Sequence, residues 1–190
     1  MNEKILIEDF EINPLTVAVL PLEYEGDKIY SKVYQLDEES ELYAPFKPLD
    51  LIKTACNIYG SSYEGRKDGS RHLVGITHKI PIAIDPTNSI YFFPTTSPSR
   101  PQCAWISYEH ICAYKKIDSK NTLVTFHNNK SIVLPISKYS FDSQVKRAAL
   151  LQTRIMQKIR DYKRRSKNHS KASESITKYG ESEEYIKIYG

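Results

Sequence analysis

Residues 140–162 read SFDSQVKRAALLQTRIMQKIRDY. Apolar side chains recur in this stretch at steps of three and four, a spacing that places them along one face of an α-helix. Ser140 precedes the stripe and belongs to the residue types that cap the first turn of a helix. The stretch therefore predicts a long amphipathic helix with a basic opposite face, and its apolar stripe consists of Phe141, Val145, Ala148, Leu151, Ile155, Ile159 and Tyr162.

Short strands are predicted in the chain that precedes this helix. Residues 15–20 and 29–35 are rich in β-branched and apolar side chains and flank the turn residues Gly26 and Asp27, which indicates a hairpin. Because consecutive strands with short connections pair in antiparallel fashion, we expect the last four of the later strands, within residues 103–136, to form an antiparallel meander. Those strand patterns, separated by turn signals, cover residues 73–78, 81–84, 89–93, 103–107, 111–116, 122–126 and 131–136.

A short internal helix is predicted between the hairpin and the later strands. Residues 48–60 begin with Pro48, end with Gly60 and carry apolar residues at helical spacing between them. Proline suits the first turn of a helix, and glycine suits the position after its last turn. Gly65 and Gly69 interrupt the stretch that follows, which predicts a loop. The predicted fold class is α+β, with mostly antiparallel β strands, one short internal helix and a long C-terminal amphipathic helix.

The length of 190 residues allows one domain with a tail. We expect a single domain over residues 1–163 and a flexible charged tail over residues 164–190, where Ser, Lys, Glu and Tyr replace the apolar stripe. No stretch approaches the roughly 18 consecutive apolar residues of a membrane span. Residues 1–5 also lack the pattern of a signal peptide. These features predict a cytoplasmic protein without a membrane partner.

Charge is distributed unevenly along the chain. Residues 1–50 hold 4 basic and 12 acidic side chains, whereas residues 111–171 hold 15 basic and 3 acidic side chains. The basic half is expected to attract a polyanion that the acidic half repels. Nucleic acid is the polyanion we expect, because each neutralised phosphate releases counterions and adds affinity. A solvated charged tail is the alternative interpretation, but it accounts only for the end of the chain.

No set of residues in the sequence indicates catalysis, a cofactor or a metal site. Residues 60–68 resemble a phosphate-binding loop, but Arg66 replaces its lysine and Asp68 replaces its magnesium-binding hydroxyl. Residues 103–112 group two cysteines with one histidine and lack a fourth zinc ligand. We therefore expect no enzyme activity, no cofactor and no bound metal. The cysteines are expected to be small buried hydrophobic side chains, namely Cys56, Cys103 and Cys112.

Two segments are candidates for contact with nucleic acid. The predicted glycine-rich loop can present Arg66, Lys67 and Arg71 to a phosphate backbone, and a plain exposed loop is the alternative. In residues 97–101, SPSRP, prolines on both sides of Arg100 hold the backbone extended. An extended segment that carries a guanidinium fits the narrow minor groove of A·T-rich DNA. A proline-rich connector that happens to carry an arginine is the alternative.

Further motifs lie between residues 60 and 110 and again just before the C-terminal helix. They are Gly60-Ser61-Ser62-Tyr63, Gly65-Arg66-Lys67, His78-Lys79, Asp85-Pro86, Phe93-Pro94-Thr95, Arg100-Pro101-Gln102-Cys103, Trp105-Ile106-Ser107, Leu134-Pro135-Ile136-Ser137 and Ser140-Phe141. In combination these motifs closely resemble the ComK family of competence transcription factors. The resemblance extends with gaps from about residue 17 to about residue 154 and fades at both ends.

This resemblance implies a cytoplasmic transcription activator of genes for DNA uptake and recombination. It implies dimers that bind paired A·T-rich boxes in double-stranded DNA, mainly through the minor groove, and that assemble further on the promoter. It also implies that these dimers help RNA polymerase and that a proteolytic adaptor controls the level of the protein. Residues 163–190 depart from the family pattern, which leaves adaptor binding and tail-dependent assembly open.

Nine basic residues are the predicted DNA contacts. We expect three of them nearest the bases, namely Arg66, Lys67 and Arg100. We expect the other six on phosphates, namely Arg71, Lys115, Lys116, Lys146, Arg147 and Lys158. The alternative hypothesis is a regulatory protein-protein interaction module without intrinsic DNA affinity, whose acidic half holds a basic partner and whose basic helix holds an acidic one.

Overall fold

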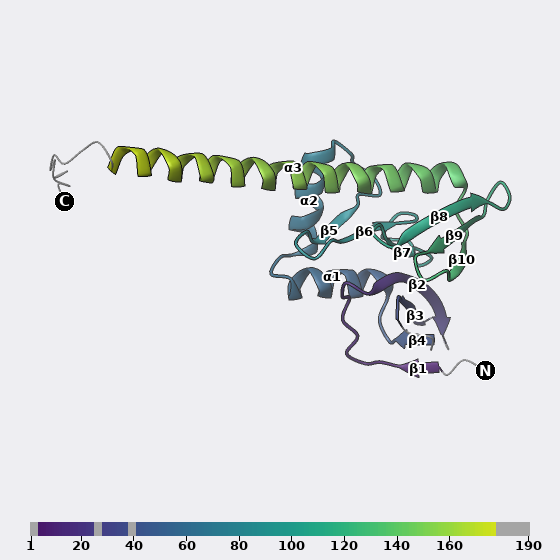
Figure 1. Cartoon of the computed structure of the whole chain (residues 1–190). Coiled ribbons are helices and arrows are strands. Elements are labelled where there is room, and N and C mark those ends of the chain that lie inside the picture. The colour runs from purple at the N-terminus through teal and green to yellow at the C-terminus, as the bar shows by residue number, and fades with distance from the viewer. Residues whose placement is uncertain (1–3, 25–27, 38–40, 178–190) are drawn as a thin grey trace. The chain divides into compact units, whose positions relative to one another are not determined.

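The computed structural model describes residues 4–24, 28–37 and 41–177, with side chains from residue 5 to residue 167. Strands and helices follow one another in an α+β order that ends in a long helix (Figure 1). The elements are β1 (Lys4–Leu6), β2 (Thr16–Tyr24), β3 (Lys28–Gln35), β4 (Glu41–Ala44), α1 (Pro48–Ile58), α2 (Tyr63–Val74), β5 (Ile82–Asp85), β6 (Ile90–Pro94), β7 (Trp105–Ser107), β8 (Ile111–Lys116), β9 (Thr122–Phe126), β10 (Ser131–Leu134) and α3 (Lys138–Thr177).

The strands form two sheets. The larger sheet has the order β1-β4-β3-β2-β7-β6-β5, and the smaller has the order β10-β9-β8. Every neighbouring pair is antiparallel except β1 with β4. The predicted fold class is therefore confirmed, and so is the hairpin of β2 and β3, although its turn at residues 25–27 lies outside the described residues.

The chain divides into two compact units, residues 1–154 and residues 155–190. Within the first unit, α1 and the first part of α3 lie on opposite sides of the central strands (Figure 1). Successive strand side chains point to opposite faces, so Phe92 packs with α1 while Phe93 packs with Phe141 of α3. In the same way, Trp105 belongs to the core beside α1, and Ile106 belongs to the core beside α3. The central strands are therefore buried on both faces.

Helix α1 begins and ends where the sequence predicts. Pro48 occupies its first turn, and Gly60 follows its last turn with φ of 72°. This left-handed conformation is easily adopted by glycine and lets the backbone N–H groups of Gly60 and Ser61 bond to the last carbonyls of the helix.

Helix α2 occupies the stretch that was expected to be a loop, and that prediction is wrong. Ser62 caps the helix by accepting a 3.0 Å hydrogen bond from the backbone N–H of Gly65. Gly75 ends it in a left-handed conformation with φ of 67°. These two caps and the burial of Tyr63 and Ser70 offset the low helix propensity of Gly65 and Gly69. The strand expected at residues 73–78 is also wrong, because α2 extends to Val74 and no strand follows before Ile82.

Helix α3 carries the predicted apolar stripe. Phe141, Ala148 and Leu151 are buried in the first unit, which confirms the amphipathic helix there. The helix begins at Lys138, and its first turn is capped by Ser137, whose Oγ accepts a 3.3 Å hydrogen bond from the backbone N–H of Ser140. The prediction that Ser140 itself caps the helix is therefore wrong by three residues.

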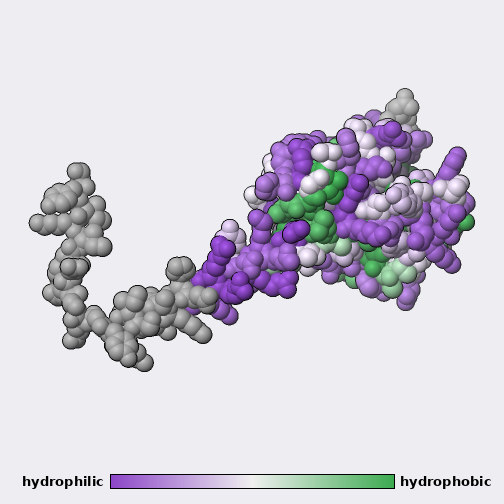
Figure 2. Space-filling model, turned by 90° about the horizontal axis from the view of Figure 1, so that it is seen from above, coloured by the Kyte–Doolittle hydropathy of each residue, from purple (hydrophilic) through white to green (hydrophobic). Residues whose placement is uncertain are grey.

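The second unit starts within α3. The helix continues past the expected boundary at Lys163 to Thr177, so regular structure reaches into the segment predicted to be a tail. Its described side chains are mainly hydrophilic, as the violet stretch beside the grey atoms shows (Figure 2). Arg164 and Asp161 form an ion pair at 3.8 Å within this unit. Among the helices of the described chain, none has the length and hydropathy needed to cross a bilayer.

Candidate nucleic-acid interface

Two adjoining hollows lie on either side of a turn formed by residues 97–99. Their volumes are about 320 Å³ and 330 Å³. Leu49, Pro98 and Ser99 line both hollows, so the hollows are neighbours that share one wall. We call the two hollows together the cationic groove, because of the side chains described next.

Basic side chains predominate among the charged residues of the cationic groove. The acidic residues that line it are Asp50 and Glu64. The lysines and the arginine are contributed by α1 and the residue before it, by α2, and by the loops before β5 and after β6. They are Lys47, Lys53, Lys67, Lys79 and Arg100, and we call them the groove cations.

Arg100 stands exposed on a loop that is held at both ends. At the base of the loop, the Thr95 hydroxyl accepts a 3.0 Å hydrogen bond from the backbone N–H of Ala104 and lies 3.2 Å from the Ala104 carbonyl. Within the loop, the backbone N–H of Arg100 donates to the Ser97 carbonyl at 2.9 Å, so the backbone turns before Arg100 and the expectation of an extended segment is wrong. The Arg100 side chain makes no hydrogen bond or ion pair with the described residues, so its charge is available to a ligand.

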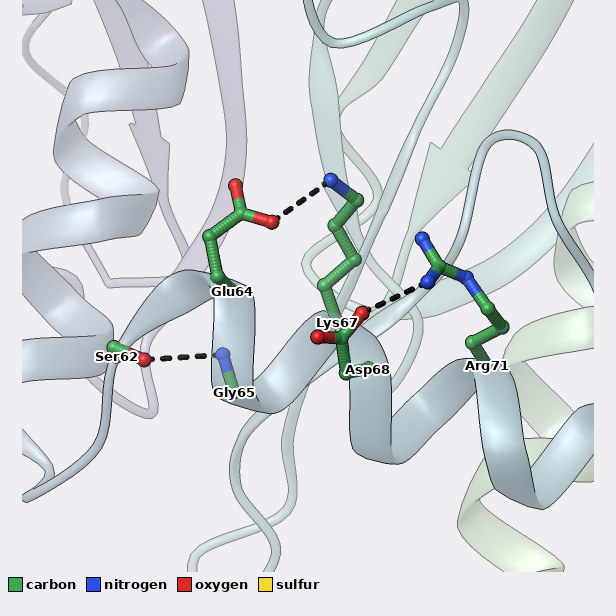
Figure 3. A network of polar contacts seen from close by, with 6 residues as sticks. All are labelled: Ser62, Glu64, Gly65, Lys67, Asp68 and Arg71. Carbon is green, nitrogen blue, oxygen red and sulfur yellow. Dashed lines mark hydrogen bonds and ion pairs between the residues drawn. The ribbon is translucent and has the colours of Figure 1, made fainter.

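Helix α2 presents Lys67 and Arg71 in ion pairs with acids three residues earlier (Figure 3). Lys67 Nζ lies 2.9 Å from Glu64, and Arg71 Nη1 lies 2.9 Å from Asp68. Exposed pairs of this kind contribute little to stability, because water and salt screen them. Both cations can therefore exchange a carboxylate for a phosphate oxygen at small cost. Lys67 lines the cationic groove, whereas Arg71 does not.

Arg66 points inward on the same helix. Its Nη2 donates a 3.3 Å hydrogen bond to the backbone carbonyl of Tyr59, at the end of α1. Its Nε is buried without a hydrogen-bond partner among the described residues. In this conformation, Arg66 connects α2 to α1 and is not directed at the cationic groove.

The predicted contacts on β8 and α3 lie outside the cationic groove. Lys115 and Lys116 are adjacent on a strand, so their side chains leave opposite faces of the small sheet. Lys146 pairs with Asp142 at 2.7 Å. Asp142 also accepts a 2.7 Å hydrogen bond from Tyr114, and these two bonds, first that from Lys146, lower the pKa of the Asp142 carboxyl below its ordinary value.

Arg147 does not line the cationic groove, and Lys158 belongs to the other unit of the chain. Arg147 Nη1 donates to the backbone carbonyl of His78 at 3.0 Å, so this side chain supports a loop that borders the groove. Lys158 belongs to the second unit and is exposed there. The structure thus brings together Lys67 and Arg100 from the nine predicted contacts.

Sequence reasoning missed three of the groove cations. Lys47 precedes α1, Lys53 lies on its exposed side, and Lys79 lies in the loop after α2. Lys47 and Lys53 have no motif around them, and the motif His78-Lys79 did not mark Lys79 as a contact. Only the folded chain shows that these lysines border the cationic groove. The sequence signal that does exist is the proline that follows Lys47 and fixes the start of α1.

A concave surface whose charged side chains are mainly lysine and arginine is typical of proteins that bind a phosphate-bearing polymer. Within residues 5–167, no group of three or more histidine, cysteine or acidic side chains is arranged to hold a metal ion. Fold and surface together therefore define the class of an α+β domain with a cationic groove.

Comparison with known proteins identifies the family. The family model described as ComK protein matches residues 7–160. The competence transcription factor of Bacillus subtilis (strain 168) is 44% identical over 153 residues, which cover 80% of this chain and 78% of that relative. The chain belongs to the ComK family, and the resemblance found in the sequence is confirmed. No solved structure matches the chain. The matched region includes the whole cationic groove.

Proposed function

We propose that this protein is a DNA-binding transcription activator of competence genes, which binds A·T-rich promoter boxes mainly through the minor groove. The name of the Bacillus subtilis relative supports the role in transcription and competence. A transcription factor family also favours a protein that is not an enzyme. The observation that carries the proposal for DNA is the position of exposed Arg100 in the lining of one hollow of the cationic groove, directly after the turn that borders both hollows.

The turn at residues 97–99 has a shape suited to a DNA minor groove. That groove is only about 6 Å wide in B-form DNA, and A·T tracts narrow it further and concentrate negative potential there. The turn that includes Pro98 leads directly to exposed Arg100, whose guanidinium can enter such a space. The remaining groove cations are distributed on both sides of the turn, with Lys47 in one hollow and Lys53, Lys67 and Lys79 in the other. They are therefore suited to the phosphates of the two strands.

This arrangement separates positioning from sequence selection. Phosphate contacts by the lysines give affinity that depends on salt and not on sequence. Arg100 supplies the preference for a narrow, electronegative groove. Dimers, further assembly on the promoter, contact with RNA polymerase, control by a proteolytic adaptor and a cytoplasmic location belong to the same proposal. So do phosphate contacts by Arg71, Lys115, Lys116, Lys146 and Lys158.

Substitution of Arg100 tests the proposal. The Arg100→Ala variant is expected to lose about 1–3 kcal/mol of binding free energy on an A·T-box duplex and much less on a G·C-rich duplex. Arg154→Ala is the matched control, because Arg154 is an exposed arginine outside the cationic groove. The control is expected to leave the ratio of the two affinities unchanged. Equal losses on both duplexes for Arg100→Ala would contradict the role of this residue.

A further inference from the structure

Gln144 is a buried polar residue of α3 whose side-chain amide contacts two separate loop segments. Only 1% of its surface is exposed. Its Nε2 donates to the backbone carbonyl of Pro94 at 2.7 Å and to that of Lys79 at 3.1 Å. Its Oε1 accepts a 3.0 Å hydrogen bond from Arg147. Both N–H groups and the carbonyl of this amide are thus engaged.

The two carbonyls belong to the segments that present groove cations. Pro94 ends β6 and precedes the loop that carries Arg100. Lys79 lies in the loop between α2 and β5 and is itself a groove cation. A single side chain therefore connects the bases of two loops that border the same hollow.

The backbone of Lys79 needs such support. Its φ is 49°, in the left-handed region that residues with a Cβ seldom occupy. A conformation of this kind costs energy and persists where the surroundings fix it. The hydrogen bond from Gln144 to the Lys79 carbonyl, together with that from Arg147 to the His78 carbonyl, supplies this restraint.

We propose that Gln144 is a positioning residue that sets the spacing between Lys79 and Arg100 across the cationic groove. This inference rests on the proposed DNA-binding function. Loss of the amide leaves two buried or half-buried carbonyls without their donor, which relaxes both loops. Selectivity for a narrow DNA groove depends on this spacing, whereas general attraction to phosphate depends mainly on charge.

The test is the affinity ratio between the A·T-box duplex and the G·C-rich duplex for Gln144→Leu. We expect this ratio to fall by about fivefold, while the salt dependence of binding stays unchanged because no charge is removed. Gln152→Leu is the matched control, because Gln152 lies on the same helix and bonds to Glu109 at 3.1 Å, away from both loops. An unchanged ratio in folded Gln144→Leu would overturn the inference. A fall that Gln152→Leu reproduces would overturn it as well.

A second variant tests the positioning of the two loops if Gln144→Leu does not fold. Arg147→Met removes the donor to the His78 carbonyl from a half-buried position and is expected to lower the same ratio to a smaller extent. An unchanged ratio in this variant would then contradict the inference. Combining Gln144→Leu, or Arg147→Met in its place, with Arg100→Ala adds a double-mutant cycle. We expect the double variant to lose less affinity for the A·T duplex than the product of the two single fold-losses. A loss equal to that product would contradict the coupling between the two residues.

Hydrogen exchange on the free protein separates this inference from the proposed function. In Gln144→Leu, backbone amides in residues 75–81 and 95–103 are expected to exchange faster, and in Gln152→Leu they are expected to match the wild type. Equal exchange in all three proteins would refute the positioning role whatever the DNA result. If the wild type does not prefer A·T DNA, the proposed function is contradicted. Faster exchange in Gln144→Leu would then still support the restraint that Gln144 places on the two loops.

Discussion

Arg66 Nη2 lies 3.3 Å from the carbonyl oxygen of Tyr59, which is the residue that ends α1. This hydrogen bond joins two helices that both border the cationic groove, since Leu49 and Lys53 of α1 and Lys67 of α2 line it. Arg66 therefore contributes to the shape of the groove through the fold. Its neighbour Lys67 contributes a charge to the groove directly.

Replacing Arg66 with methionine is expected to lower the free energy of unfolding by about 0.5–1.5 kcal/mol, because a charged donor to a helix-end carbonyl is lost. Denaturant titration measures this change. Lys67→Met is the matched comparison, and we expect it to change stability by less than about 0.5 kcal/mol while it weakens DNA binding. If Arg66→Met kept full stability and lost DNA affinity as Lys67→Met does, Arg66 would be a direct contact and its inward position would be irrelevant.

Lys53 and Lys79 are expected to contact phosphates. Substitution of either by alanine should weaken binding to the A·T and G·C duplexes alike and reduce the slope of log affinity against log salt by about 1. Lys120 is exposed in the turn between β8 and β9 and does not line the cationic groove, so Lys120→Ala serves as the control. A slope that stays constant in both groove variants would exclude these lysines from the phosphate contacts.

Gly69 provides a test of α2 as a helix. A Cβ added there meets no atom within 4 Å, and the residue lies in the helix interior. Gly69→Ala is therefore expected to raise the free energy of unfolding by about 0.5–1 kcal/mol, because alanine has the higher helix propensity. Gly65→Ala is the contrast, since its Cβ would lie 3.1 Å from the capping Ser62 hydroxyl and disturb the helix start. Destabilisation by Gly69→Ala would indicate that this segment is not helical.

The cysteines should differ in reactivity. Cys112 is exposed, whereas Cys56 and Cys103 are buried, so the expectation that each cysteine is buried holds for two of the three. Burial raises the pKa of the Cys56 thiol to about 11, and its thiolate is therefore scarce at pH 8. A thiol reagent at pH 8 is expected to modify about one group per native chain quickly and the others only after unfolding. Cys112→Ser should abolish the rapid reaction, and its persistence would place another thiol at the surface.

Much of the fold could be predicted because local patterns and long-range packing agree. The strands from β6 to β10 are short, apolar and bounded by turn residues, and α3 carries a stripe that buries Phe141 and Leu151. Helix α2 could not be predicted from its glycines, although Ser62 at its start and Gly75 after its end are recognisable caps. Strands β1 and β4 escaped prediction because each has only three or four residues and begins with a charged residue, Lys4 or Glu41.

Residues of the candidate site could be predicted only where they belong to a recognisable local sequence motif. The prolines around Arg100 and the charge pattern near Lys67 singled out two segments that the fold brings to one groove. The inward direction of Arg66 depends on the Tyr59 carbonyl, a tertiary contact that no sequence pattern records. Gln144 is likewise visible only in the folded chain, since its partners Pro94 and Lys79 lie 50 and 65 residues away.

Titration of the wild-type protein against an A·T-box duplex and a G·C-rich duplex of equal length, at several salt concentrations, tests the central claim most directly. The cationic groove predicts binding that weakens steeply with salt, with a slope of about −3 to −5 if most of its five cations meet phosphates. It also predicts a clear preference for the A·T duplex at every salt concentration. No binding at micromolar protein, or equal affinity for both duplexes, would contradict the account and favour a module that acts through protein partners.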